Sequence, residues 1–188
     1  MNADTELPVH SDTDLSRLDE QGLLDLLRHD MDCAPRNLID ACVDRGAAMV
    51  QALQQLSDDS GFWDDTDDGQ WWLRYHMAMI AGLIAGEQAG LLLVTLMRRL
   101  DEIRDDDMQD WLAGYWPALF ANKPQSLAQP LRDLTEDHEY GVYIRSNSAQ
   151  VVISLAQRAG EAELEAALDW LASLMADEGV EWSLRLNL

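Results

Sequence analysis

Basic residues are scarce in this sequence, and lysine is almost missing. Thirteen Lys and Arg residues stand against 35 Asp and Glu residues in a chain of 188, so the formal net charge is -22. Lys123 is the single lysine. So large a negative charge opposes binding to nucleic-acid phosphates and to anionic lipid. We therefore expect no nucleic-acid or membrane partner, and the charge favours a basic protein or peptide.

Cysteines and targeting segments are also few. The two cysteines, Cys33 and Cys42, make neither a disulfide framework nor a CxxC pair. The first ten residues, MNADTELPVH, have no basic start and no apolar stretch of the kind that marks a signal peptide. We expect a reduced, cytoplasmic protein that uses no cofactor.

Long apolar runs are absent except for one, Trp71–Leu100. Within it, the stretch Met77–Met97 carries one formal charge and is close to the length of a membrane span. However, Glu87 lies in the middle, where a carboxylate is costly in a bilayer, and Gly86 and Gly90 flank it as in a turn. The run therefore predicts two buried helices joined by a tight turn.

The rest of the chain predicts more amphipathic helices of ordinary length. Residues 1–14 are polar and acidic and predict a flexible leader, and residues 15–188 are expected to form a single domain. Ser16 is the expected cap of the first helix. An acidic loop is expected over 57–69, and Pro117 should kink or end a helix over 108–120. The later helices are expected over 142–159 and 161–175, on either side of Gly160.

The sequence repeats itself weakly. Residues 72–81, WLRYHMAMIA, align with 143–152, YIRSNSAQVV, through an aromatic residue, an aliphatic residue and an arginine. Trp111-Leu112 begins a further helix in the same way. The steps from Leu73 to Leu112 and from Leu112 to Ile144 are 39 and 32 residues, the length of a helical hairpin repeat.

Each repeated position has a physical role to fill. The small residues Ala78 and Ala149 would let helices approach closely. Arg74 and Arg145 lie beside acidic turns and are expected to bridge consecutive hairpins through carboxylates. The third copy departs from the pattern, because Ala113 stands where the arginine is expected.

This motif resembles the HEAT-type repeat of armadillo-like α-solenoids. The order PRNLIDACVDRGAAMVQAL, acidic loop, WWLRYHMAMIAGLIA, DWLAGYWPALFA and YIRSNSAQVVISLA is similar to an uncharacterised bacterial HEAT-like family. The resemblance covers roughly residues 35–175. It implies an all-α, right-handed solenoid of about four stacked antiparallel hairpins plus an N-terminal helix. A Cys/His-rich metal motif found in some members is not implied, because no cysteine follows Cys42.

One loop resembles the start of a calcium-binding EF-hand. Asp64, Thr66 and Asp68 have the spacing of its first ligands, and Gly69 takes the sixth position. Tyr75 replaces the glutamate that closes the cage, so we expect an acidic turn that caps the following helix, with weak calcium binding as the alternative.

No other group of residues forms a familiar catalytic motif. His29, Cys33 and Cys42 are too few for a closed zinc shell, so no metal site is expected. Phosphate-binding loops, nucleophile elbows and HExxH motifs are missing. If the chain is an enzyme, in the manner of HEAT-like lyases, the candidates are Tyr75, His76 and Tyr115.

The aromatic residues give the main functional hypothesis. Trp72, Trp111 and Tyr143 take equivalent repeat positions and form either an inter-repeat core or the floor of an acidic groove. The leading interpretation is a non-enzymatic scaffold that binds a protein segment, with an enzyme or an acidic DNA mimic as alternatives, and a homo-oligomer also open. The candidate partner-binding residues are Trp72, Arg74, Tyr75, Trp111, Tyr115, Tyr143 and Arg145.

Overall fold

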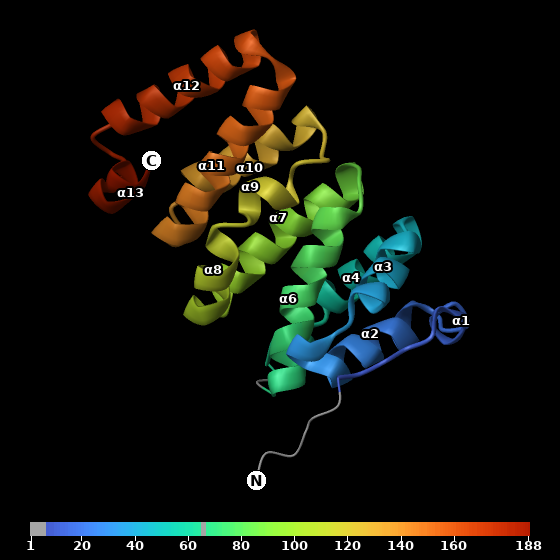
Figure 1. The fold of residues 1–188 in the computed structure, drawn as a ribbon. Helices are drawn as coiled ribbons and strands as arrows, with labels where there is room; N and C mark the ends of the chain where they lie inside the picture. The colour runs from blue at the N-terminus through green and yellow to red at the C-terminus, as the bar shows by residue number, and fades with distance from the viewer. Residues whose placement is uncertain (1–6, 65–66) are drawn as a thin grey trace. The chain divides into compact units, whose positions relative to one another are not determined.

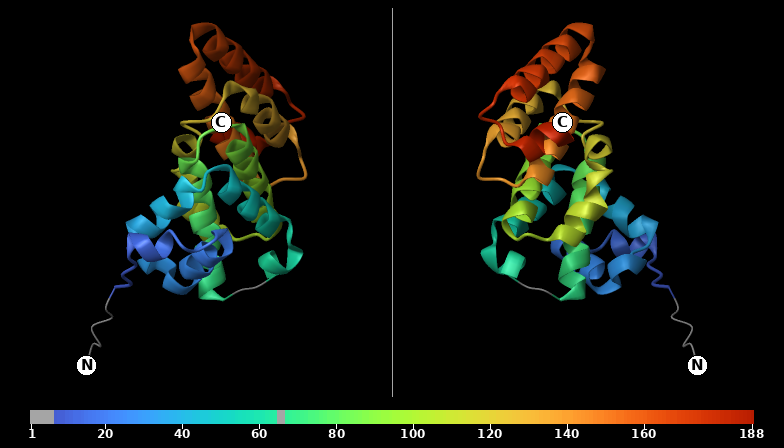
Figure 2. Two further views of the ribbon diagram at one scale, coloured as in Figure 1. Left: turned by 90° about the vertical axis from the view of Figure 1, so that its right-hand side faces the viewer. Right: turned by 90° about the vertical axis from the view of Figure 1, so that its left-hand side faces the viewer.

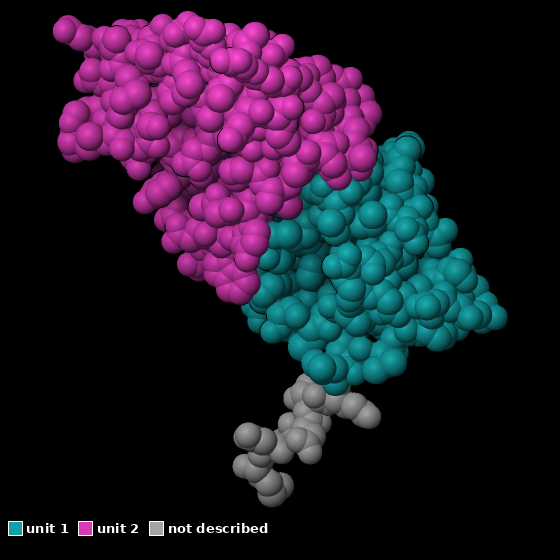
Figure 3. Space-filling view, turned by 45° about the horizontal axis from the view of Figure 1, so that its top comes forward, with its two compact units in different colours: residues 1–84 teal, residues 85–188 magenta. Residues whose placement is uncertain are grey.

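The computed structural model describes residues 7–64 and 67–188, and every regular element in this part of the chain is a helix (Figures 1 and 2). The expected all-α class is confirmed. The chain divides into two compact units, Met1–Ile84 and Ala85–Leu188 (Figure 3).

Unit 1 is built around one helix, α6. It packs against α2, α3 and the 3-10 helix η1. Ten of its sixteen residues are buried, which is why its sequence is apolar on most of its circumference. The elements of unit 1 are α1 (Asp12–Leu15), α2 (Glu20–Asp30), η1 (Met31–Cys33), α3 (Arg36–Asp44), α4 (Ala47–Asp58), α5 (Ser60–Asp64) and α6 (Asp68–Leu83).

Unit 2 is built in the same way around α11. This helix packs against α7, α8, α9, α10, η2, α12 and α13, and ten of its eighteen residues are buried. The elements of unit 2 are α7 (Glu87–Glu102), α8 (Asp106–Ala113), α9 (Trp116–Leu119), η2 (Gln125–Leu127), α10 (Ala128–Glu136), α11 (Val142–Ala159), α12 (Glu161–Ala176) and α13 (Trp182–Asn187).

The apolar run Trp71–Leu100 forms parts of two helices, as expected. Helix α6 ends at Leu83 and α7 begins at Glu87, and Gly86 between them has a φ of 105°, which favours glycine. No helix in the described ranges is long and apolar enough to cross a membrane.

Three local expectations need correction. Ser16 does not cap the first long helix: Asp19 does, and its side chain accepts a hydrogen bond from the Gly22 N–H. The acidic loop 57–69 contains the short helix α5, which was not predicted from the sequence. The helix expected over 108–120 is two helices, and Pro117 lies in the first turn of the second, where its missing N–H is tolerated.

Residues expected in the leader also contribute to the fold. Ser11 caps α1, and His10 Nε2 lies 2.6 Å from Asp30 Oδ2 at the end of α2. The Asn37 side-chain amide donates to the His10 carbonyl at 2.8 Å. These contacts attach residues 10–12 to unit 1.

Candidate functional site

The repeated arginines perform the same structural task in the two units. In unit 1, Arg74 Nη2 donates to the carbonyls of Phe62 and Trp63 at 2.8 and 3.0 Å. In unit 2, Arg145 Nε donates to the Thr135 carbonyl at 2.8 Å. Each guanidinium therefore satisfies carbonyls at the end of the preceding helix, groups that lack partners within their own helix.

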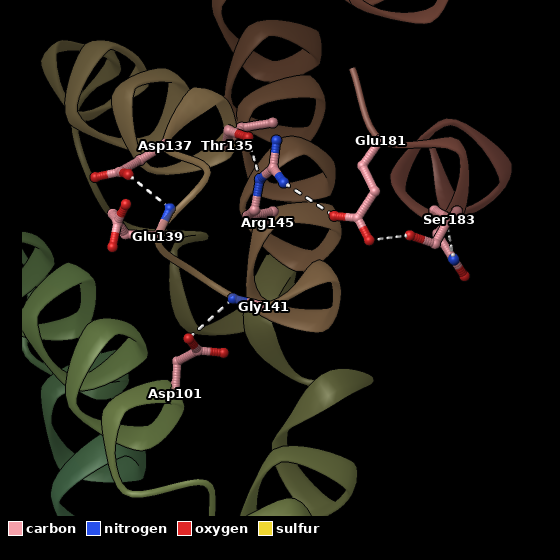
Figure 4. A network of polar contacts seen from close by, with 9 residues as sticks. Asp101, Thr135, Asp137, Glu139, Gly141, Arg145, Glu181 and Ser183 are labelled. Carbon is pink, nitrogen blue, oxygen red and sulfur yellow. Dashed lines mark hydrogen bonds and ion pairs between the residues drawn. The ribbon is translucent and has the colours of Figure 1, made fainter. Parts of the chain in front are cut away.

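Arg145 is also part of the polar network in Figure 4. Its Nη1 lies 3.7 Å from Glu181 Oε2, and the other Glu181 oxygen accepts from the Ser183 hydroxyl at 2.6 Å. The ion pair thus joins α11 to the segment before α13. The sequence predicted that Arg145 pairs with a carboxylate in the turn before α11. Glu181, just before α13, forms the ion pair instead.

Burial removes both arginines from the list of binding candidates. Arg74 is 5% exposed and Arg145 is 1% exposed. A partner at the surface therefore has no access to either guanidinium.

A glutamine also recurs at the repeat spacing, although it was not predicted from the sequence. Gln70 lies 39 positions before Gln109, the same step as from Leu73 to Leu112. The Gln70 amide donates to the Phe62 carbonyl at 2.9 Å, and the Gln109 amide donates to the Leu100 carbonyl at 3.3 Å. In the copy without arginine, the glutamine keeps the same link to the end of the preceding helix.

The aromatic candidates of unit 1 form one cluster on α6. Trp72 is half-buried and lies edge-to-face against Trp71 at 4.9 Å and Tyr75 at 5.8 Å between ring centroids. His76 lies 6.2 Å from Trp72. All four rings belong to residues of α6.

His76 has a structural partner at its ring nitrogen. Nε2 lies 2.7 Å from the Met31 carbonyl, and because a carbonyl only accepts, Nε2 carries the hydrogen. Burial lowers the pKa of His76 below its usual 6.5, although the bond to Met31 opposes this shift. The neutral ring therefore holds Met31, whose φ of 52° ends α2.

The enzyme candidates come from both units. Tyr75 and His76 belong to unit 1, whereas Tyr115 belongs to unit 2. Tyr115 is 51% exposed at the start of α9. The Tyr75 and His76 ring centroids lie 6.0 Å apart, and a catalytic role for the three residues stays a prediction.

The aromatic candidates of unit 2 lie at the surface. Trp111 and Tyr115 are each 51% exposed and Tyr143 is 68% exposed, so none of the three is inter-repeat core. Trp111 and Tyr143 come from α8 and α11, which pack against each other.

Tyr143 lies at a depression of about 360 Å³ in unit 2. The depression lies where the end of α7, the start of α8 and the turn before α11 meet. Trp111 and Tyr115 do not line it. The lining residues are Asp101, Arg104, Asp106, Gln109, Glu139, Tyr140, Gly141 and Tyr143.

A hydrogen bond shapes one wall of this depression. Asp101 Oδ2 accepts from the Gly141 N–H at 2.9 Å (Figure 4). A Cβ atom at Gly141 would lie 2.7 Å from Asp101 Oδ1, so a larger residue there would require the Asp101 side chain to shift. Asp137 Oδ1 accepts from the Glu139 N–H at 3.0 Å and shapes the same turn.

The charges around the depression are mostly negative. Asp101, Asp106 and Glu139 supply three carboxylates, and Arg104 supplies one guanidinium. Tyr143 adds an exposed ring beside them. Carboxylates next to an aromatic face suit a lysine or arginine side chain.

The metal candidates gain no further support. Asp64 ends α5, Asp68 begins α6, and Asp67 caps α6 by accepting from the Gln70 N–H at 3.0 Å. Thr66 lies outside the described residues, so the calcium alternative remains a prediction. Within the described ranges, no group of three or more His, Cys, Asp or Glu side chains is placed to hold a metal ion.

The two cysteines differ in exposure. Burial raises the pKa of Cys42 to about 12, so this thiol is protonated and packs as a small apolar group. Cys33 is half-buried, and its pKa is also raised. Neither has the lowered pKa of a reactive thiol.

The chain matches no protein-family model, and no curated protein or solved structure is significantly similar to it. The resemblance to HEAT-type repeats therefore remains an expectation from the sequence.

Proposed function

We propose that this protein is a non-enzymatic scaffold that binds a basic segment of another protein. The observation that carries the proposal is the depression of unit 2, where the exposed ring of Tyr143 lies beside three carboxylates. A lysine or arginine side chain placed there would gain a cation–π contact and a charge-assisted hydrogen bond. Together these recognise a cation specifically.

The net charge supports a basic partner. At -22, the chain attracts cationic segments over distances of about a Debye length, ~8 Å at physiological salt. This field raises the association rate, whereas the depression supplies the specific contacts.

The proposal includes a repeat architecture of the HEAT-like, right-handed solenoid kind, with about four stacked hairpins. Two features of the described residues support it. Consecutive helices pack in unit 2, as α10 does with α11 and α11 with α12. Equivalent side chains, Arg74 with Arg145 and Gln70 with Gln109, donate to the end of the preceding helix.

A charge reversal tests the binding site. Glu139 is exposed, so Glu139→Lys should leave the fold intact while it repels a cationic segment. We expect a short arginine-containing peptide to bind the wild-type protein and to bind this variant at least about tenfold more weakly, because a tenfold loss needs only ~1.4 kcal/mol. Tyr143→Ala should weaken binding as well.

Asp110→Lys is the matched control. Asp110 is exposed on α8 and does not line the depression, and its replacement by lysine changes the net charge by the same two units. Equal losses with Asp110→Lys and Glu139→Lys would mean that only the overall field matters, and the proposed site would be rejected.

A further inference from the structure

Helix α12 is apolar in sequence, but most of its residues are exposed. Ala167 is its single buried residue out of sixteen, whereas ten of eighteen are buried in α11. Both views of Figure 2 show α12 along the outside of unit 2, with α11 on one side. A surface helix normally carries polar residues on its outer side, so the exposed apolar residues of α12 need a reason.

One face of α12 is firmly attached to unit 2. Leu164, Ala167 and Leu174 are buried or half-buried on this inner face. Trp170 Nε1 donates to Glu136 Oε1 of α10 at 2.6 Å, and the Arg132 guanidinium lies 5.1 Å above the Trp170 ring. The helix is therefore held as a fixed platform.

A second apolar stripe lies beside this inner face. Leu168, Leu171, Ala172 and Met175 are spaced i, i+3, i+4 and i+7, so they line one side of the helix over two turns. Leu168 is 49% exposed and Met175 is 46% exposed. We call these four residues the α12 stripe. Its spacing is the one by which an amphipathic helix pairs with another helix.

The charges beside the stripe select the kind of partner. Three exposed carboxylates follow the stripe on its outer side: Glu161, Glu165 and Asp169. Residues 161–176 contain no lysine or arginine. A second copy of the chain would bring the same carboxylates and another net charge of -22 to the contact. Like charges at such flanking positions oppose pairing, and opposite charges favour it.

We propose that the α12 stripe docks a basic amphipathic helix of a partner protein. The apolar side of that helix covers Leu168 and Met175, and its flanking lysines or arginines pair with Glu165 and Asp169. This inference goes beyond the proposed function, because it uses a different surface and a helical partner instead of single cationic side chains.

Two designed helical peptides test it. Both carry leucines at i, i+3, i+4 and i+7; the flanking positions are lysine in one and glutamate in the other. We expect the lysine peptide to bind the full chain in fluorescence anisotropy titrations, and the glutamate peptide to bind at least about tenfold more weakly. Added salt should reduce this difference, because it screens exposed charges.

Three variants locate the contact. The double change Leu168→Gln with Met175→Gln should weaken binding of the lysine peptide at least about tenfold, because two apolar contacts are lost. Leu91→Gln is the matched control, since Leu91 is exposed on α7 of the same unit and outside the stripe. Glu165→Lys with Asp169→Lys should reverse the preference between the two peptides.

Three results would overturn the inference. One is equal binding of the lysine and glutamate peptides, and another is binding that the Leu168/Met175 change leaves unaltered. The third is a dimer in sedimentation velocity that this change converts to a monomer, which would make a second copy the occupant. Glu139→Lys should not alter helix binding, so failure of this inference and failure of the proposed function can be told apart.

Discussion

Replacing Arg145 by methionine tests how much its buried guanidinium contributes to stability. The side chain is 1% exposed, and Nε donates to the Thr135 carbonyl at 2.8 Å. Methionine fills much of the same volume but cannot donate. Arg145→Met therefore leaves a carbonyl at the end of α10 without its donor.

The expected loss follows from the two contacts. A hydrogen bond from a charged donor contributes about 1.5–3 kcal/mol, and an orphaned buried carbonyl adds to the loss. The ion pair with Glu181 contributes little, because Glu181 is 56% exposed and the N–O distance is 3.7 Å. We expect the free energy of unfolding to fall by about 2–3 kcal/mol, or roughly 5–10 °C in Tm.

Urea titration followed by circular dichroism measures this change. Glu181→Gln is the control, because it removes the ion pair and keeps the hydrogen bond; it should cost about 0.5 kcal/mol or less. Amide hydrogen exchange should also become faster in the last turn of α10 in Arg145→Met.

One result would refute the reasoning directly. Burying a guanidinium costs desolvation energy, and apolar replacement of buried charges can be neutral or stabilising. If Arg145→Met is as stable as the wild type, desolvation outweighs the contact with Thr135, and the arginine is not a structural cap. A loss in Glu181→Gln equal to that in Arg145→Met would assign the effect to the ion pair instead.

Three further predictions concern stability and titration. Gly90→Ala should lower the free energy of unfolding in urea titrations by about 1–3 kcal/mol, because its Cβ would lie 2.1 Å from Leu127 Cδ1. Gly114→Ala, whose Cβ would have nothing within 4 Å, should be neutral or stabilising. The pKa of His76 is lower in the folded than in the unfolded state, so the unfolded state binds the proton first as the pH falls. The free energy of unfolding should therefore fall as the pH drops below 6.5. His76→Gln should lack this part of the pH dependence, and an unchanged pH profile in this variant would contradict the prediction. Burial lowers the pKa of Lys123 to about 8, so an NMR pH titration of this single lysine should have its midpoint near that value. A titration midpoint near the ordinary 10.5 would show that the amine is solvated.

Much of the fold was predictable because its signals are local. Helix α11 begins at Val142 and ends at Ala159 as predicted, since Gly141 and Gly160 bound a long apolar pattern. The repeat alignment also pointed to α6 and α11, which prove to be the central helices of the two units. Helix α5 was missed because a five-residue helix is too short to show a period.

The candidate site was less predictable because it depends on distant residues. Tyr143 was proposed from its repeat position, and it is exposed beside a depression. Asp101 and Glu139 were not singled out, because acidic residues are frequent throughout the chain and only packing brings these two close to Tyr143. Gly141, two residues before the repeat motif, was the one available signal.

The sequence by itself determined the helical class, the bounds of α11 and α12 to within one residue, and the negative charge, because apolar periodicity, capping residues and composition act over a few neighbouring residues. Tertiary structure alone decided what each helix face meets. It buried Arg74 and Arg145 against the carbonyls of preceding helices and left one apolar side of α12 exposed. An amphipathic pattern states that a face prefers to leave water, but only the packed neighbours determine whether the chain itself covers that face.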